Sequence, residues 1–523
     1  MVLRRRLKQD IKPSLSTTLP TMRIAYASLA AGALATAALA GSHSLSIDPS
    51  QSKKSKFGIS TLLESSINFC TDGGIYAELI RNRAFQEEGD TSYWKSSGSA
   101  QLQQTKKNQL SDALPNSVLV KSSSNNKEFG LRNEGFFGVP VKPQTYNVSF
   151  YARSDTEQYV KAKAGLFSHK GKQYASVDVP LDLTSSWKQF TAELKNSQSA
   201  DNSKNNTFGL TFPAGTSEIQ LNLISLFPPT YQDTIGRPDL VQVLADLKAP
   251  YTRLPGGNEL EGNTIKQAFN WSEAVGPLKD RPGRPSVWAG YDTEGYGVHE
   301  MLNLFESIGS EPILGVYGGY SLDGSSVSKD DLEPYVQSAV NQLHYIKDAR
   351  GSSAHAKRRE ANGRAEPWTL NYVEIGNEDW LGEAPIKTYS YRYPAFYQAL
   401  KSAFPDIKYL ASSPYSTDKS KLEAIDQHDY NTPAFAYSQF QTHDSWPRNG
   451  TEIMELEYAV LNNGRCGEAD ETDLYSNSCR LTYPTLESAL AEAAWTAGFE
   501  RNGDLVTAAA YAPLFRNDYS SQW

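Results

Sequence analysis

Apolar residues follow two different patterns along this chain. Between about 90 and 230, short runs such as VLVKSS and YNVSFYARS alternate apolar and polar positions, and Asn, Ser, Gly and Lys clusters separate them. Alternation with a period of two is typical of strands that bury one face, and many such strands at short spacing predict an antiparallel β-sandwich. After about 232, continuous apolar runs such as EPILGVYGG follow amphipathic helical stretches. That pattern predicts buried parallel strands joined by helices.

Eight apolar strand candidates occur in all, from FGISTLLE near the start to LVTAAAYAPLF near the end. We therefore predict an α/β fold, a (β/α)8 TIM barrel, with the antiparallel β-sandwich inserted after the first strand and helix. The stretch GGIYAELIRNRAF is expected to form that helix. The expected boundaries are 57–90 for the first barrel strand and helix, 91–231 for the inserted sandwich, and 232–523 for the remaining barrel, which ends after strand 8.

The first forty residues predict export. Met22-Arg23 precedes an Ala/Leu-rich run that ends in Ala-Leu-Ala just before Gly41. A short positive region, an apolar stretch and an A-x-A site together form a secretory signal, which we place at 1–40, with Met22 as an alternative start. The run is shorter and less apolar than a membrane span requires. We expect an extracellular protein, with residues 41–56 as a linker or a leading strand.

Charge and composition narrow the class of ligand. Lys and Arg total 51 against 59 Asp and Glu, for a net charge of −8. This balance argues against a nucleic-acid-binding protein, which would carry a basic face. The chain has 29 Tyr and 9 Trp, side chains whose apolar faces and polar edges suit sugar rings.

Candidate modification sites are consistent with export. Cys466 and Cys479 bracket a short polar loop and are expected to form one disulfide in an oxidising compartment, which leaves Cys70 over. Four N-x-S/T sequons are candidate N-glycosylation sites, at Asn147, Asn205, Asn270 and Asn449.

Carboxylates at the ends of the barrel strands are the candidate catalytic groups, because TIM-barrel sites form at that face. The fourth strand candidate ends in the sequence from Glu374 to Asn377 and Glu378, and the seventh contains Glu455 and Glu457. Glycoside hydrolysis needs two carboxyl groups: one protonates the leaving oxygen, and the other attacks the anomeric carbon or activates water. Alternation puts Glu374 and Glu378 on one face and leaves open which is catalytic. It also predicts that Glu455 shares the face of Glu457.

Other kinds of catalytic site find no support in the sequence. The seven histidines show neither H-x-H nor H-E-x-x-H spacing, and neither G-x-G-x-x-G nor G-x-S-x-G is present. We therefore expect no metal and no cofactor.

The motifs EIGNED, LEYAV, LPGGN-LEGNT, DGGIYAELIRNRAFQ and YAPLF followed by Gln-Trp resemble the fungal type of glycoside hydrolase family 51, the α-L-arabinofuranosidases. The resemblance covers about 57–90 and 232–523, and the sandwich is similar to the carbohydrate-binding-module-like domain of those members. It implies that Glu378 is the acid/base, that Glu457 is the nucleophile, and that Asn377 contacts the sugar 2-hydroxyl. It further implies an arabinose pocket, supported by Arg253 and lined by Glu64, Asn258, His428 and Tyr430. Relative to that family, the C-terminal β-sandwich is expected to be absent and the chain truncated.

The function implied by the resemblance is that of a retaining, exo-acting α-L-arabinofuranosidase. It would release terminal non-reducing α-L-arabinofuranosyl residues from hemicellulose or pectin in plant cell walls, such as arabinoxylan and arabinan, by double displacement. Its partners would be arabinose-containing polysaccharides and oligosaccharides, with no nucleic acid and no membrane. Two alternatives stay open: another retaining barrel glycosidase, such as an endoglucanase or xylosidase, and a carbohydrate-binding protein with an inactive barrel.

Overall fold

The computed structural model describes most of the chain after the N-terminal region. Side chains are described for residues 67, 69–87, 91–200, 205–413, 422–462, 480–481, 483–515 and 517, and the backbone also for 58–64 and 68. No helix in these segments is long and apolar enough to cross a membrane.

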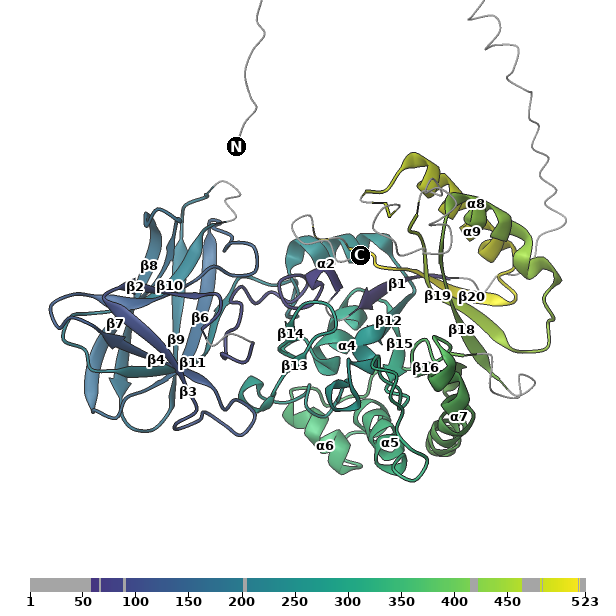
Figure 1. The fold of residues 1–523 in the computed structure, drawn as a ribbon, viewed down its shortest axis with the longest axis horizontal. Coiled ribbons are helices and arrows are strands. Elements are labelled where there is room, and N and C mark those ends of the chain that lie inside the picture. The colour runs from purple at the N-terminus through teal and green to yellow at the C-terminus, as the bar shows by residue number, and fades with distance from the viewer. Residues whose placement is uncertain are drawn as a thin grey trace, which may run out of the picture. The chain divides into compact units, whose positions relative to one another are not determined.

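Two antiparallel five-stranded sheets form the β-sandwich (Figure 1). One contains, in spatial order, β2 (Trp94–Gly98), β5 (Phe129–Asn133), β10 (Thr207–Phe212), β7 (Gln158–Phe167) and β8 (Gln173–Leu183). The other contains β3 (Ala100–Thr105), β4 (Ser117–Ser122), β11 (Ile219–Phe227), β6 (Gln144–Arg153) and β9 (Lys188–Asn196). All these strands lie within the segment that the alternating pattern marked.

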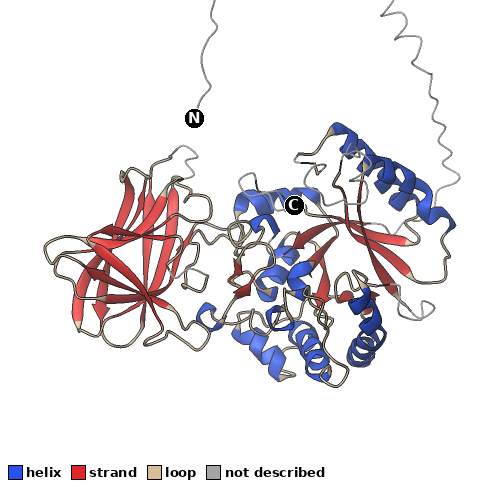
Figure 2. Cartoon of the chain, in the orientation of Figure 1, coloured by secondary structure: helices blue, strands red, loops and turns tan. Residues whose placement is uncertain are grey.

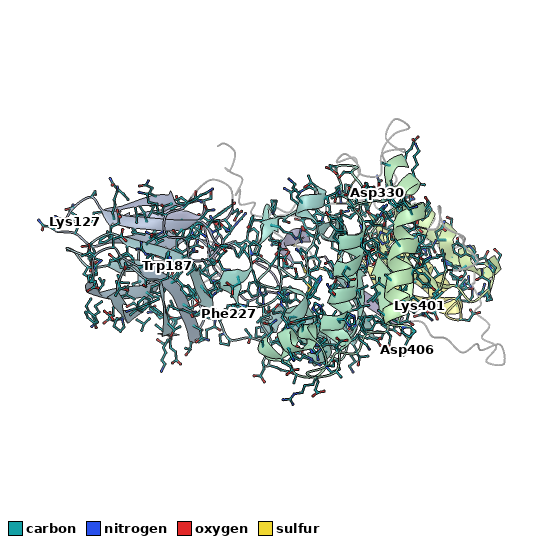
Figure 3. All side chains as sticks on the ribbon, turned by 90° about the horizontal axis from the view of Figure 1, so that it is seen from below. Lys127, Trp187, Phe227, Asp330, Lys401 and Asp406 are labelled. Carbon is teal, nitrogen blue, oxygen red and sulfur yellow. The ribbon has the colours of Figure 1, made fainter. Side chains whose placement is uncertain are left out.

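The sandwich encloses its own apolar core. Side chains such as Phe129, Phe150 and Leu210 are completely buried between the sheets. Lys127, labelled in Figure 3, is exposed, and Trp187 donates its indole N–H to the carbonyl of Asn108 at 2.7 Å. In β7, exposed and buried positions alternate from Tyr159 to Ala164, so the alternation in the sequence separates a buried face from a solvated one, as the pleat of a strand requires.

Eight strands in the described part of the chain close a parallel barrel in chain order. They are β1 (Gly58–Glu64), β12 (Tyr251–Gly256), β15 (Glu311–Val316), β16 (Tyr372–Ile375), β17 (Lys408–Ala411), β18 (Ala424–Asn431), β19 (Glu452–Val460) and β20 (Val506–Tyr511). Helices cover the barrel strands (Figure 2). The α-helices are α2 (Pro238–Leu247), α3 (Asn258–Glu261), α4 (Val298–Ser307), α5 (Glu333–Lys347), α6 (Ala354–Ala361), α7 (Glu383–Ala403), α8 (Pro433–Ser438) and α9 (Leu486–Arg501). A short hairpin of β13 (Arg284–Pro285) and β14 (Tyr291–Asp292) lies between α3 and α4.

The helix predicted for GGIYAELIRNRAF, residues 73–85, is wrong. The segment consists of turns, an isolated bridge at Tyr76 and irregular backbone. Glu78 supplies the reason, because its buried carboxylate accepts the backbone N–H groups of Ile80 and Leu226 at 2.9 and 3.0 Å and the hydroxyl of Ser225 at 2.5 Å. These bonds fasten the segment to β11 of the sandwich, so tertiary contacts outweigh the local helical pattern.

The turn after β16 requires glycine. Gly376 has a φ of 87°, and a Cβ atom there would lie 2.0 Å from Oδ2 of Asp379. That carboxylate is fixed by the hydroxyl of Ser412 at 2.6 Å and by the guanidinium of Arg392 at 2.7 Å. The tight turn directs Asn377 and Glu378 to the carboxyl end of the barrel, where TIM-barrel sites form.

Gly376→Ala tests this constraint, with Gly324→Ala as its control. Gly324 has a similar φ of 85°, but its added Cβ would meet no atom within 4 Å. Left-handed backbone alone costs a non-glycine residue about 1–2 kcal/mol. We expect Gly324→Ala to lose about that much unfolding free energy in urea denaturation, and Gly376→Ala to lose clearly more and to turn over substrate more slowly. Equal losses would contradict the proposed close approach to Asp379.

Candidate active site

Arg253 on β12 is the centre of a buried polar cluster inside the barrel. Its Nε and Nη2 donate to the two carboxyl oxygens of Glu374 at 2.6 and 2.9 Å, and Nη1 donates to Oε1 of Glu457 at 2.6 Å. Nη2 also donates to Oδ1 of Asn377 at 2.7 Å. Arg253 and Glu374 are completely buried. The planar guanidinium fits bidentate pairing of this kind, and here it links β12, β16 and β19.

His428 on β18 lies between the two carboxyl groups that the resemblance selects. Its Nδ1 is 3.0 Å from Oε1 of Glu378 and 3.5 Å from Oε2 of Glu457, and its Nε2 is 2.7 Å from Oδ2 of Asp426. One carboxylate oxygen of Glu378 and one of Glu457 lie within 4.8 Å of each other. Retaining glycosidases separate their carboxyl groups by about 5–5.5 Å and inverting ones by about 6.5–9.5 Å, so an oxygen–oxygen approach this close favours the retaining arrangement.

Electrostatics hold Glu457 ionised. Burial alone would raise its pKa, but His428, Arg253 and the hydroxyl of Tyr430, which donates to Oε2 at 2.7 Å, together lower it below its usual value. Burial would lower the pKa of His428, yet the neighbouring carboxylates of Asp426 and Glu457 raise it well above its usual value. An imidazolium beside an ionised carboxylate is the arrangement that a carboxylate nucleophile needs.

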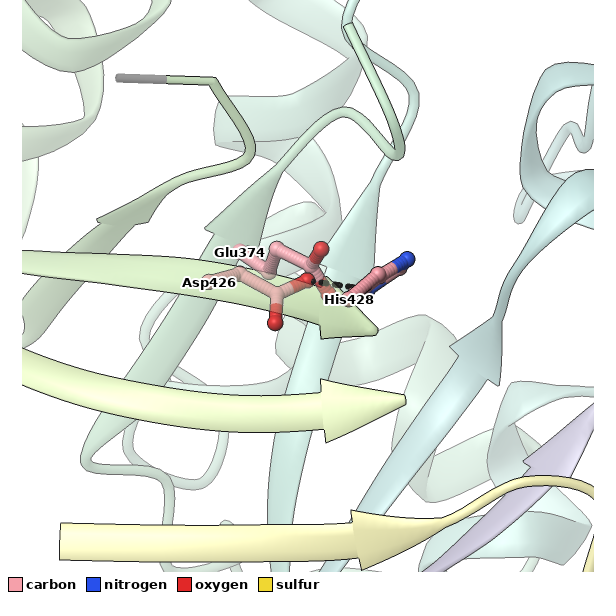
Figure 4. A group of neighbouring side chains, drawn as sticks. All are labelled: Glu374, Asp426 and His428. Carbon is pink, nitrogen blue, oxygen red and sulfur yellow. Dashed lines mark hydrogen bonds and ion pairs between the residues drawn. The ribbon is translucent and has the colours of Figure 1, made fainter. Parts of the chain in front are cut away.

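Glu374 lies beside Asp426 and His428, and the dashed line in Figure 4 marks the contact between Asp426 and His428. Burial raises the pKa of Glu374 to about 8 although Arg253 opposes this effect, and the nearby Asp426 raises it further. Burial would also raise the pKa of Asp426, but His428, Arg253 and a hydrogen bond from Glu374 lower it. Glu374 is therefore protonated at neutral pH and fully buried behind Arg253, whereas the Glu378 side chain is 13% exposed. This placement favours Glu378 as the group that reaches a leaving oxygen.

Two sets of ligand-type atoms in the cluster lie close enough together to hold a metal ion: Glu374 with Asp426 and His428, and His428 with Glu378 and Glu457. The guanidinium of Arg253 already occupies both oxygens of Glu374. An imidazolium has no lone pair to offer a cation. The donor set therefore fits an ion-pair and proton network better than a metal centre.

The structure joins two predicted pocket residues through one that the sequence analysis missed. The Nδ2 atoms of Asn258 and Asn377 each donate to Oε2 of Glu261 at 2.9 Å. Glu261 is the last residue of α3 and is 2% exposed. The sequence signal for Glu261 was its place in the LEGNT motif, which begins three residues after Gly257.

Glu455 does not share the face of Glu457, contrary to the prediction. The pairing of β18 with β19 shifts register between Glu455 and Glu457, which is a β-bulge. Leu456 packs in the cluster inside the barrel, and Glu455 lies in register with Ala509, which packs on the outer side against α9. There, burial and the neighbouring Asp429 raise the pKa of Glu455 well above its usual value.

Several predicted residues lie wholly or partly outside the described part of the chain. Glu64 ends β1, and its backbone pairs with Gly256, but its side chain is not among those described. The proposed disulfide partners Cys466 and Cys479 also lie outside the described residues. The sequon asparagines are exposed at positions 147, 205 and 449 and half-buried at position 270.

Comparison with known protein families gives three matches. Residues 243–448 match the model of the alpha-L-arabinofuranosidase 1 domain, and residues 457–518 match the alpha-L-arabinofuranosidase C-terminal domain. Residues 77–211 match a carbohydrate binding domain. The first two matches contain Arg253, Glu378, His428 and Glu457, and the third overlaps the sandwich.

Individual proteins agree with these matches. Alpha-L-arabinofuranosidase A of Aspergillus kawachii is 32% identical over 474 residues, which cover 87% of this chain and 71% of that protein. Alpha-L-arabinofuranosidase 1 of Arabidopsis thaliana is 31% identical over 483 residues, covering 87% and 66%. The solved structure of arabinose-bound MgGH51 α-L-arabinofuranosidase superposes with a TM-score of 0.84 at 35% identity, covering 90% of this chain and 76% of that one.

Glu374→Gln tests the proton held in the cluster. A carboxyl group with an ordinary pKa of 4.5 that rises to about 8 in the folded protein binds an extra proton between those two pH values. Its contribution to stability is therefore fully present below about pH 4.5 and is lost as the pH rises through about 8. Glutamine imitates the protonated acid, so the melting temperature of Glu374→Gln should fall less than that of the wild type between pH 5 and pH 8.5.

Glu128→Gln, at an exposed position of the sandwich, is the matched control and should leave the pH dependence of melting unchanged. If the melting temperatures of Glu374→Gln and the wild type fell equally between pH 5 and pH 8.5, Glu374 would already be ionised in the folded protein and the prediction would be wrong.

Proposed function

The chain belongs to glycoside hydrolase family 51, the α-L-arabinofuranosidases, and we propose that it acts by double displacement with retention of configuration. As an α-L-arabinofuranosidase it is an exo-acting glycoside hydrolase that releases α-L-arabinofuranosyl residues. The observation that carries the mechanism is the approach of the Glu378 and Glu457 carboxylates to within 4.8 Å around His428.

In the first step, an oxygen of Glu457 attacks the anomeric carbon while the bond to the leaving oxygen breaks. Glu378 gives its proton to that oxygen, so the alcohol departs neutral and Glu378 becomes a carboxylate. Both oxygens of Glu457 carry hydrogen bonds, Oε1 from Arg253 and Oε2 from Tyr430, which fix the direction of attack. The product of this step is a covalent arabinofuranosyl ester on Glu457.

In the second step, water attacks the anomeric carbon of the ester. Glu378, now a carboxylate, takes a proton from that water, and Glu457 leaves as a carboxylate. Arg253 and His428 stabilise the negative charge that returns to Glu457, because their positive charges are already in place. Glu378 itself adopts a left-handed backbone with a φ of 45°, a strain of the kind that functional sites hold.

The natural substrates we propose are the arabinofuranosyl side chains of arabinoxylan and arabinan in plant cell walls. The match of residues 77–211 to a carbohydrate binding domain supports a polymeric substrate. We also propose that the protein is secreted and N-glycosylated. The signal-like N-terminal sequence and the three exposed sequon asparagines support both proposals.

Glu378→Ala and Glu457→Ala should fail at different steps. Glu378→Ala removes proton donation, so we expect hydrolysis of an alkyl arabinofuranoside to slow by about 10²–10⁴-fold. A dinitrophenyl leaving group needs little protonation, so that substrate should release a burst of dinitrophenolate and then stall as the ester accumulates. Azide needs no general base and should restore turnover with an α-configured arabinofuranosyl azide as product. These outcomes can be measured by absorbance and by NMR of the azide.

Glu457→Ala cannot form the ester and should show no burst, and azide could only attack directly to give the β-configured product. As a control, the melting temperatures of both variants should be close to that of the wild type, which would show that both fold. If Glu374→Ala showed the burst and azide rescue and Glu378→Ala did not, the acid/base would be Glu374 and the mechanism above would be wrong.

A further inference from the structure

Glu261 is a buried carboxyl group at the edge of the site, and it has no part in the double displacement described above. Its backbone is held on both sides: Ser321 donates its hydroxyl to the carbonyl of Glu261 at 2.8 Å, and the N–H of Gly262 bonds to the carbonyl of Asn258 at 2.9 Å. Gly262 has a φ of 66°, and a Cβ atom there would lie 2.4 Å from the carbonyl oxygen of Gln267. These contacts fix the backbone at Glu261, and with it the direction in which the Glu261 side chain extends.

The Glu261 carboxyl group determines how two asparagine amides are oriented. A primary amide has nearly the same shape when its oxygen and nitrogen are exchanged, so its orientation depends on the groups that face it. Asn377 has a donor, Arg253, facing its oxygen and an acceptor, Glu261, facing its nitrogen. Among the described residues, Glu261 is the hydrogen-bond partner of the Asn258 side-chain amide. Each Nδ2 keeps one N–H group that Glu261 does not occupy.

The state of Glu261 suits this role. Burial and the nearby Glu378 raise its pKa well above the usual value, against the opposing effect of the two amide donors, so the group is a neutral acid. Because Oε2 accepts both amides, the proton belongs on Oε1, which has no hydrogen-bond partner among the described residues. Glu261 lines one pocket together with Asn377 and Tyr320. Oε1 is itself buried, so Glu261 acts on a bound sugar through the two amides and not by touching it.

We propose that Glu261 is a positioning residue that holds the amides of Asn258 and Asn377 with their free N–H groups toward the arabinofuranosyl hydroxyls. Recognition of the sugar 2-hydroxyl by Asn377 then depends on Glu261. This inference rests on the proposed function and on the place of both asparagines in the sugar pocket. Glu261 takes no part in bond making, yet it would determine how strongly the site prefers a furanoside with a 2-hydroxyl over its 2-deoxy analogue.

Glu261→Gln and Glu261→Met separate positioning from simple packing. Glutamine keeps a carbonyl for the two amides and a donor in place of the acid hydroxyl, so kcat/KM should stay within about threefold of the wild type. Methionine keeps the volume but accepts no strong hydrogen bond. For 4-nitrophenyl α-L-arabinofuranoside, we expect Glu261→Met to lower kcat/KM by roughly 10–100-fold, the size of one or two lost hydrogen bonds in a buried site. For the 2-deoxy analogue, kcat/KM should fall by less than about threefold.

Glu259→Met is the matched control, because Glu259 lies in the same short helix and is also buried but pairs with Arg284 and Ser286. Any loss of activity in that variant should be equal on the two substrates. If Glu261→Met melts far below the wild type, Glu261→Asp provides the same comparison, since its shorter side chain withdraws the oxygen from both amides.

Equal losses on the parent and 2-deoxy substrates in the Glu261 variants, or no loss on either, would overturn this inference while leaving the arabinofuranosidase mechanism standing. A wild-type protein that hydrolysed neither substrate would instead overturn the proposed function itself. The two failures are therefore distinguishable in one set of measurements.

Discussion

The guanidinium of Arg253, buried without solvent contact in the barrel, is the interaction on which the site depends. An uncompensated buried charge costs several kcal/mol, so its surroundings must neutralise it. Arg253 and a protonated His428 carry two positive charges, and Asp426 and Glu457 carry two negative ones. A protonated Glu374 adds none. The charges of these five groups therefore balance with Glu457 ionised, which is the state in which this carboxylate can attack the anomeric carbon.

The two catalytic carboxyl groups differ in how tightly they are held, and the difference matches their tasks. Glu457 receives donors on both oxygens and cannot easily rotate or gain a proton. Glu378 has a single close polar contact with His428 in the described part of the site and is partly exposed. A group that must give up a proton and later take one from water has to reach both the leaving oxygen and the solvent. The bulge in β19 and the glycine turn after β16 bring the two groups to the same nitrogen of His428, Nδ1.

Much of this arrangement follows from the sequence, and the errors have identifiable physical causes. Buried parallel strands and alternating sandwich strands are local patterns, so the architecture could be predicted. The prediction of a helix over 73–85 was wrong because two partners of Glu78, Ser225 and Leu226, lie 147 and 148 positions away. Glu455 was placed on the wrong face because nothing in an alternating run indicates a bulge. Glu261 was missed because its bond to Asn377 spans 116 positions, and only the fold brings them together.

The stereochemistry of transfer to methanol tests the central claim most directly, because it reports whether a covalent ester precedes attack by the acceptor. The protein is incubated with 4-nitrophenyl α-L-arabinofuranoside in buffer containing methanol, and the methyl glycoside is identified by proton NMR, since it cannot mutarotate. Double displacement through Glu457 predicts methyl α-L-arabinofuranoside as the transfer product. Methyl β-L-arabinofuranoside, or an initial burst of β-configured arabinose without transfer, would contradict it.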